Sequence, residues 1–176
     1  VSTARDFIVN YIEDDRAFLR AHDPRRDRED FEKAWAVRAS GVSGEIQSFE
    51  PNYEGSPLVV GSAGGATSAV GSHSFKARAG HHLAPQLLSG GRNVFEELGA
   101  GFTLFAFDAP AQDVAAFEAA AKARGAPLKV VRDSFTQGRS AYEARLILVR
   151  PDTFVAFAGD TAAPDAATIF ATVIGG

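Results

Sequence analysis

The chain contains neither cysteine nor methionine among its 176 residues. Without cysteine it has no disulfides, thiolate metal ligands or cysteine nucleophiles, and thioredoxin-type redox chemistry is excluded whatever the fold. This composition is compatible with the cytoplasm, which is the compartment that we expect. The missing methionine includes an initiator, and this favours a fragment of a longer product.

Basic charge and long apolar runs are also scarce. The 18 lysines and arginines stand against 22 aspartates and glutamates, for a net charge of -4. No basic excess is available to neutralise phosphates, so we expect no nucleic-acid partner. No apolar run approaches the roughly 18 residues of a membrane-spanning helix, so we expect no membrane association. A hydrophobic content of 45% is typical of a globular protein.

The N-terminal part of the chain has a helical pattern. Residues 4–21 predict an amphipathic helix, and a charged stretch at 22–30 interrupts it. A second short helix is predicted over residues 28–37. Both helices expose aromatic side chains, so we expect them to pack on something else. From 39 to 75 the pattern changes to short apolar pieces with glycine and proline, including a small-residue loop at 61–68.

The C-terminal half is more regular. It predicts, in order, a strand at 102–107, a helix capped by Asp108 and ending near Arg124, a strand at 128–131, two strands at 144–149 and 153–157, and a helix at 164–174. The first three elements imply a parallel pair joined by a helix, and the next two add antiparallel strands. The predicted fold class is therefore α/β, with a thioredoxin-like mixed sheet and flanking helices preceded by two N-terminal helices.

The strand at 102–107 carries large apolar side chains on both faces. Phe102, Phe105 and Phe107 all lie within it, and Phe154 and Phe157 belong to another strand. Apolar residues on both faces predict a sheet with both of its faces covered by other parts of the protein. We expect helices on one side and another domain or subunit on the other.

A distributed pattern is carried by residues 51–58, 80–85, 88–99, 101–104, 125–131, 148–156 and 159–160. In these segments the chain resembles the C-terminal region of flavin-dependent aromatic-ring hydroxylases, the phenol, chlorophenol and hydroxyphenylpropionate hydroxylases. The similarity extends over residues 40–176. One departure is local: members often have the order Arg-Ala-Pro-His near position 80, where this chain has His81-His82-Leu83-Ala84-Pro85.

The resemblance implies a division of the chain. Residues 1–38 would be a helical remnant of a preceding flavin and substrate domain, 39–79 a connecting segment, and 80–176 a non-catalytic packing and dimerisation domain. The parent enzyme would use FAD and NAD(P)H to hydroxylate a phenolic ring. The partners would be the missing N-terminal flavin domain and a second subunit, and this chain would hold no cofactor.

No residue of this chain is predicted to be catalytic, cofactor-binding or metal-binding. The loop at 61–71 lacks the G-x-G-x-x-G spacing and is not expected to precede a helix, so a dinucleotide site is not expected there. His81 and His82 would point to opposite faces of a strand and could not readily share a metal. Either one could contact the flavin domain.

The other chemically suggestive residues have simpler explanations. Ser72, His73 and Ser74 are sequence neighbours, which rarely form a nucleophile and base pair. His22 is the one further histidine. The charge run at 25–30 is expected to be a solvated linker. Asp152 is expected to support the turn at 150–152 between two strands.

Two alternatives to the hydroxylase interpretation remain open. The chain could be a stand-alone, cysteine-free thioredoxin-like binding module, which would be a compact monomer with residues 1–38 folded onto it. It could also be a cysteine-free isomerase or hydrolase, which would require a cluster of titratable groups that the sequence does not indicate.

Overall fold

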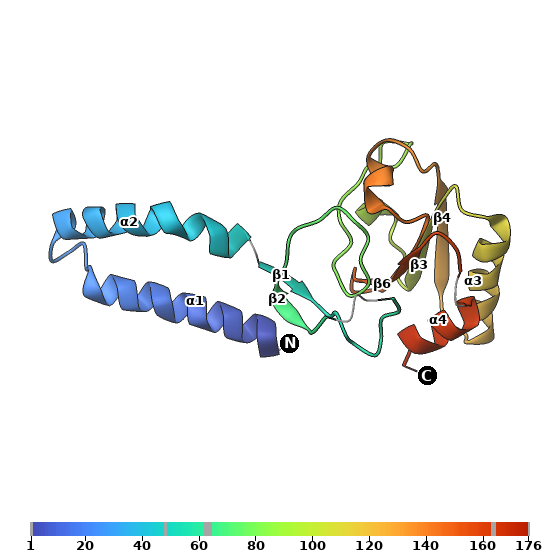
Figure 1. Ribbon diagram of the computed structural model, residues 1–176, viewed down its shortest axis with the longest axis horizontal. Coiled ribbons are helices and arrows are strands. Elements are labelled where there is room, and N and C mark those ends of the chain that lie inside the picture. The colour runs from blue at the N-terminus through green and yellow to red at the C-terminus, as the bar shows by residue number, and fades with distance from the viewer. Residues whose placement is uncertain (1, 48, 62–64, 163–164, 176) are drawn as a thin grey trace. The chain divides into compact units, whose positions relative to one another are not determined.

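The computed structural model describes residues 2–47, 49–61, 65–162 and 165–175. By its internal contacts the chain divides into two compact units (Figure 1). Unit 1 consists of Val1–Pro51 and Ser68–His73, and unit 2 of Asn52–Thr67 and Ser74–Gly176. The chain thus leaves unit 1, returns to it for the segment Ser68–His73, and leaves it again.

Unit 1 is built on a hairpin of two helices (Figure 1). These are α1, Ser2–Ala21, and α2, Arg28–Gln47. The turn between them is fixed by Asp27, whose Oδ1 accepts a 3.0 Å hydrogen bond from the backbone N–H of Asp30 and so caps α2. A pair of short strands follows, β1 at Phe49–Asn52 and β2 at Ser68–Val70.

The two helices meet through aromatic rings. The ring of Phe18 on α1 lies 6.0 Å from that of Phe31 and 5.9 Å from that of Trp35 on α2. The guanidinium of Arg38 lies over the Phe18 ring at 4.8 Å and bonds to Asp14 and Asp15 of α1 at 2.7 Å each. None of the described side chains from residue 4 to 40 is buried, so this part of the hairpin has no core.

The predicted end of the second helix near residue 37 is wrong, because α2 continues to Gln47. The predicted change of pattern after residue 39 began at Gly41 and Gly44. A glycine inside a helix costs only about 1 kcal/mol relative to alanine and does not stop it. The expected loop at 61–68 is also shorter, since Ser68 begins β2; residues 62–64 lie outside the described part of the chain.

Unit 2 contains a four-stranded mixed sheet. Its strands are β3 at Phe102–Phe107, β4 at Leu128–Asp133, β5 at Leu146–Val149 and β6 at Val155–Gly159. The order across the sheet is β4-β3-β5-β6, with β3 parallel to β4 and the other pairs antiparallel. The mixed sheet with flanking helices after two N-terminal helices is therefore confirmed.

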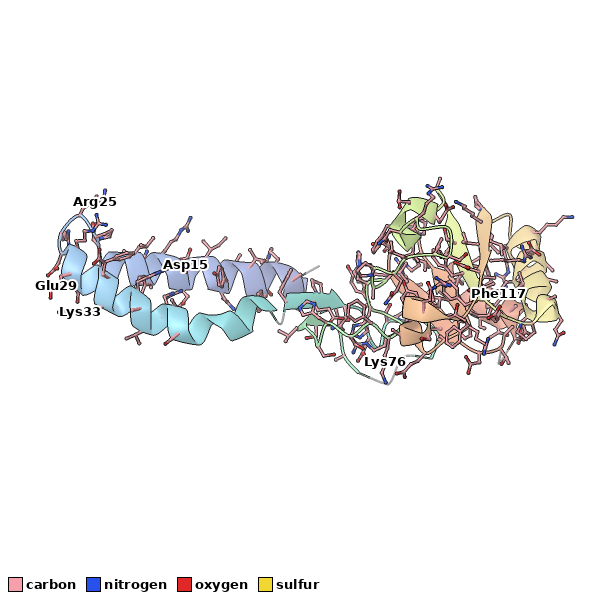
Figure 2. The ribbon with its side chains drawn as sticks, turned by 90° about the horizontal axis from the view of Figure 1, so that it is seen from above. Asp15, Arg25, Glu29, Lys33, Lys76 and Phe117 are labelled. Carbon is pink, nitrogen blue, oxygen red and sulfur yellow. The ribbon has the colours of Figure 1, made fainter. Side chains whose placement is uncertain are left out.

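Helices cover one face of this sheet. Helix α3, Ala111–Ala123, crosses from β3 to β4, and helix α4, Ala166–Val173, follows β6. Their buried side chains pack on alternate residues of the strands, and Figure 2 shows Phe117 of α3 within this layer. The side chains predicted to face inward are all buried: Val114, Phe117, Ala121, Ile169, Phe170 and Val173.

The opposite face is covered by the chain itself, which corrects the expectation of a second domain or subunit there. Phe105, Phe107 and Ile147 project to this side and are fully buried. Residues 77–98, here called the covering segment, lie over them and contribute the fully buried Val94. Such irregular segments have no periodicity that would reveal them, and sequence patterns register only the regular elements.

The start of α3 differs from prediction. The N-cap residue of α3 is Pro110, with an extended backbone (φ -57°, ψ 133°) and no side-chain hydrogen bond to the helix. Asp108 therefore does not cap α3. Asp108 has a left-handed backbone with φ 47°, and its Oδ2 accepts a 2.8 Å bond from the N–H of Phe135. Gly125 ends the helix as predicted, with φ 61°.

Candidate functional site

The two adjacent histidines lie on a segment that runs along β6. The N–H of Gly80 donates to the carbonyl of Val155 at 2.8 Å, and the N–H of Val155 donates to that of His81 at 2.8 Å. Alternation along this extended segment turns neighbouring side chains to opposite sides. His81 is accordingly buried, with 3% exposed, whereas His82 is exposed.

His81 is held by a carboxylate from the connecting segment. Its Nε2 lies 2.6 Å from Oε1 of Glu54, in an environment from which water is largely excluded. Gly80 makes this approach possible: it has φ 89° and accepts a 2.7 Å bond from the N–H of Tyr53. A Cβ there would lie 2.8 Å from the backbone of Tyr53 and Glu54, so only glycine fits.

His82 has different partners. Its Nε2 lies 2.6 Å from the hydroxyl of Thr153, and its ring lies 5.4 Å from that of Phe154 and 5.7 Å from that of Phe95. The expectation that the two histidines face opposite ways is therefore confirmed. The ring of His82 is exposed, so a further domain could contact it directly. Contact with the His81 ring would require its buried pair with Glu54 to be displaced.

The remaining histidines lie elsewhere. Nδ1 of His22 is 2.6 Å from Oδ2 of Asp30 across the hairpin turn. His73 donates its backbone N–H to Glu50 at 2.6 Å and has φ 47°. Within the residues that the structure describes, no three His, Asp or Glu side chains are grouped in a way that could hold a metal ion.

A buried charged network missed by sequence reasoning joins the covering segment to the loop after β4. The Arg139 side chain has 1% exposed and donates to the carbonyls of Ser134 and Leu87 at 2.6 and 2.9 Å. Its Nε lies 3.5 Å from Oδ2 of Asp133, which also accepts the N–H of Ser89 at 2.7 Å. No motif spacing signals these contacts, which link residues far apart in the sequence.

The electrostatics of Asp133 follow from these bonds. Burial alone would raise the pKa of this carboxyl. Hydrogen bonds from the Ser89 side chain and backbone and from the N–H of Ser134, together with the charge of Arg139, outweigh burial and lower its pKa below the ordinary value. The network stabilises the fold and presents no free reactive group.

The carboxyl edge of the parallel strands is where α/β folds commonly bind ligands. Here an open hollow of about 380 Å³ is lined by Asp108, Arg132, Asp133 and small apolar side chains at the start of α3. A flavin pyrophosphate would need a glycine turn and backbone N–H groups at that helix start. The turn holds Asp108 and Pro110 instead, and carboxylates are two of the three charged groups in the hollow, beside Arg132, so this edge lacks the glycine turn of a flavin pyrophosphate site.

The glycine loop at 61–71 does not supply a phosphate site in its described residues either. Gly61 has φ 80°, and the element that follows is the strand β2 and not a helix. The tip of the hairpin carries the charge run at 25–30, and Figure 2 labels Arg25 and Glu29 of this run and the nearby Lys33. Members of the run form local pairs with residues just outside it, such as Glu29 with Lys33 at 2.7 Å, as expected of a solvated linker.

Solved structures similar to this chain include flavin-dependent enzymes. The rebeccamycin biosynthetic enzyme RebC, in its substrate-free form, is 26% identical with a TM-score of 0.63 over 89% of this chain and 29% of that one. Aklavinone-11 hydroxylase, solved with FAD and aklavinone, is 25% identical with a TM-score of 0.56 over 77% and 28%. The flavin-dependent monooxygenase PieE shares the fold at 19% identity, with a TM-score of 0.62 over 88% and 31%.

Sequence comparison defines the class more closely. The family model for the C-terminal region of aromatic-ring hydroxylases matches residues 76–175, more than half of the chain. No curated protein matches the sequence of this chain. The family match defines the class as the C-terminal region of aromatic-ring hydroxylases. The chain belongs to the aromatic-ring hydroxylase C-terminal family, and it spans less than a third of the length of RebC and aklavinone-11 hydroxylase in these alignments.

Proposed function

We propose that this chain is the non-catalytic C-terminal packing domain of an FAD-dependent, NAD(P)H-using hydroxylase of phenolic rings. The observation that carries this proposal is the family match at 76–175, which falls on unit 2. The carboxyl edge of unit 2 carries carboxylates in place of a phosphate-binding turn, so FAD would be held by the part of the parent that this chain lacks. FAD would supply the oxygen chemistry there.

The proposed role divides the chain as the resemblance implies. Residues 1–38 would belong to the preceding flavin domain, 39–79 would connect, and 80–176 would pack. Unit 2 supports the self-contained packing domain, because both faces of its sheet are closed by its own residues and it needs no second domain to complete its core. It also takes in residues 52–67 and 74–79 of the proposed connecting segment. In the parent it would dock through its surface, and a homodimer through this domain is part of the proposal.

No described helix is both long and apolar enough to cross a bilayer. We expect the parent in the cytoplasm.

The non-catalytic role is tested in the parent enzyme at the hollow beside α3. Asp108→Asn and Arg132→Gln each remove one of the three charges of this hollow with little change of shape. We expect turnover of NAD(P)H with a phenolic substrate to stay within about twofold of the unchanged parent, since loss of a group that acts on the transition state typically costs tenfold or more. A drop beyond tenfold in either variant, with FAD content and unfolding temperature unchanged, would place chemistry in this domain and refute the proposal.

A further inference from the structure

An open hollow rich in arginine lies where α1 passes into the turn before α2, at the end of the hairpin where Figure 2 labels Arg25. It has a volume of about 340 Å³, and ligand sites typically measure about 300–1,000 Å³. Its lining, here called the arginine hollow, consists of Arg16, Leu19, Arg20, Asp23, Arg25 and Arg26. The lining thus carries four guanidinium groups and one carboxylate, whereas the whole chain has a net charge of -4.

Helix α1 supplies two of these arginines. Arg16 and Arg20 are four residues apart and therefore lie on the same side of the helix. Arg16 is paired with Glu13 at 2.8 Å. Arg20 forms no ion pair and no side-chain hydrogen bond with any residue that the structure describes. A cation in the last turn of a helix is favoured by the helix dipole, but the dipole amounts to about half a charge and leaves the guanidinium of Arg20 without a counter-ion.

The turn supplies the other two arginines. The Arg25 side chain donates to both carboxylate oxygens of Asp23 at 3.0 Å, and its backbone N–H donates to Oδ1 at 2.9 Å. Arg26 lies outside both helices, and its side chain has no hydrogen bond or ion pair within the described part of the chain. The side-chain and backbone hydrogen bonds of Arg25, with the charges of Arg25 and Arg26, lower the pKa of Asp23 below its ordinary value. The arginine hollow therefore stabilises a negative charge placed within it.

The carboxylates that follow in the sequence have other partners. Glu29 is paired with Lys33 at 2.7 Å, and Asp30 with His22 at 2.6 Å. Asp27 accepts the N–H of Asp30 and caps α2. None of these three carboxylates lines the arginine hollow. The two arginines without an acidic partner are therefore available to an anion from outside the chain.

We propose that the arginine hollow binds a doubly charged phosphate group, either as inorganic phosphate or as the phosphate monoester of a small molecule. Arg20 and Arg26 bind its oxygens, because the planar guanidinium fork matches the geometry of phosphate. Arg16 and Arg25 add positive charge beside them. Leu19, which is 50% exposed, forms an apolar wall for the organic part of an ester. The site is independent of the proposed function, since all of its residues belong to unit 1 of this chain.

Titration of residues 1–176 with inorganic phosphate and with phenyl phosphate tests the site, followed by NMR shifts of backbone amides and arginine side chains. At about pH 8 a phosphate monoester is doubly charged, because its second pKa is about 6. We expect one saturable site, with shifts centred on residues 16–26. Arg20→Gln and Arg26→Gln should each weaken the affinity about tenfold, because each removes a charged hydrogen bond. Arg26 lies outside the helices, so Arg26→Gln should leave the helix content measured by circular dichroism unchanged.

Arg124→Gln is the matched control, because it removes the same charge from an exposed position at the end of α3. This variant should bind phosphate as tightly as the unchanged chain. Shifts that do not saturate, or equal affinities in Arg26→Gln and Arg124→Gln, would refute the proposal. Tighter binding of phenyl phosphate than of inorganic phosphate would support an ester as the ligand, and equal or weaker binding would support free phosphate.

Discussion

The buried guanidinium of Arg139 donates a 2.9 Å hydrogen bond to the backbone carbonyl of Leu87, and so fastens the covering segment to the edge of the sheet. Two further polar contacts act in the same way. Asp133 accepts the N–H of Ser89 at 2.7 Å, and the hydroxyl of Tyr142 donates to the carbonyl of Ala84. Side chains near the sheet thus fix three points of an irregular segment, and this closes the second face of the core.

Replacing Arg139 with methionine should destabilise unit 2 strongly. The change leaves the half-buried Asp133 without its counter-charge and the Leu87 carbonyl without its donor. Breaking a buried pair from one side typically costs about 3–5 kcal/mol. Urea unfolding of residues 1–176 measures this. The matched change Arg124→Met, at an exposed position at the end of α3, should stay within about 0.5 kcal/mol of the unchanged chain.

The lowered pKa of Asp133 predicts a loss of stability in acid. The carboxyl is more acidic in the folded chain than in the unfolded one. Its contribution is therefore full above the unfolded value near pH 4 and is lost as the pH falls through the lower folded value. The free energy of unfolding should decline from about pH 5 downward. Asp133→Asn should be less stable at neutral pH and decline less in acid; parallel curves for the two proteins would contradict the assignment.

Tyr142 makes the corresponding prediction at alkaline pH. Burial raises the pKa of its phenol. Stability from the neutral phenol is full below the unfolded value of about 10 and is lost as the pH rises toward the folded value. Tyr142→Phe should cost about 1–3 kcal/mol at pH 7, because the buried carbonyl of Ala84 loses its donor. The difference between the two proteins should narrow above about pH 10 in denaturant titrations, and a constant difference would argue against the shifted phenol.

Gly80 should tolerate no side chain. Its φ is 89°, and a Cβ added there would lie 2.8 Å from the backbone of Tyr53 and Glu54, so Gly80→Ala combines backbone strain with a clash. We expect a loss of about 2–4 kcal/mol. Gly90→Ala is the matched control, because nothing lies within 4 Å of where its Cβ would stand and its φ is not positive. Thermal unfolding of the two variants gives the comparison. Equal melting temperatures would contradict the close approach of Gly80 to the backbone of Tyr53 and Glu54.

Much of unit 2 is predictable from the sequence because its elements are periodic. The strand at 102–107, the helix that Gly125 ends and the order of the elements along the chain all follow from local pattern. The contact of Glu54 with His81 is not predictable, because it joins residues 27 apart through a glycine with an unusual backbone. Asp108 shows the limit of local rules: it stands before a helix, but Pro110 displaces it from the capping position.

We propose that flavin chemistry takes place outside this chain, and a measurement of flavin binding is the direct test. Residues 1–176 are purified and titrated with FAD, and NADH and NADPH consumption is followed with a phenolic substrate present. We expect no stoichiometric FAD and no consumption above the rate of free flavin. One FAD bound per chain, with substrate-dependent oxidation of NADH or NADPH, would contradict it.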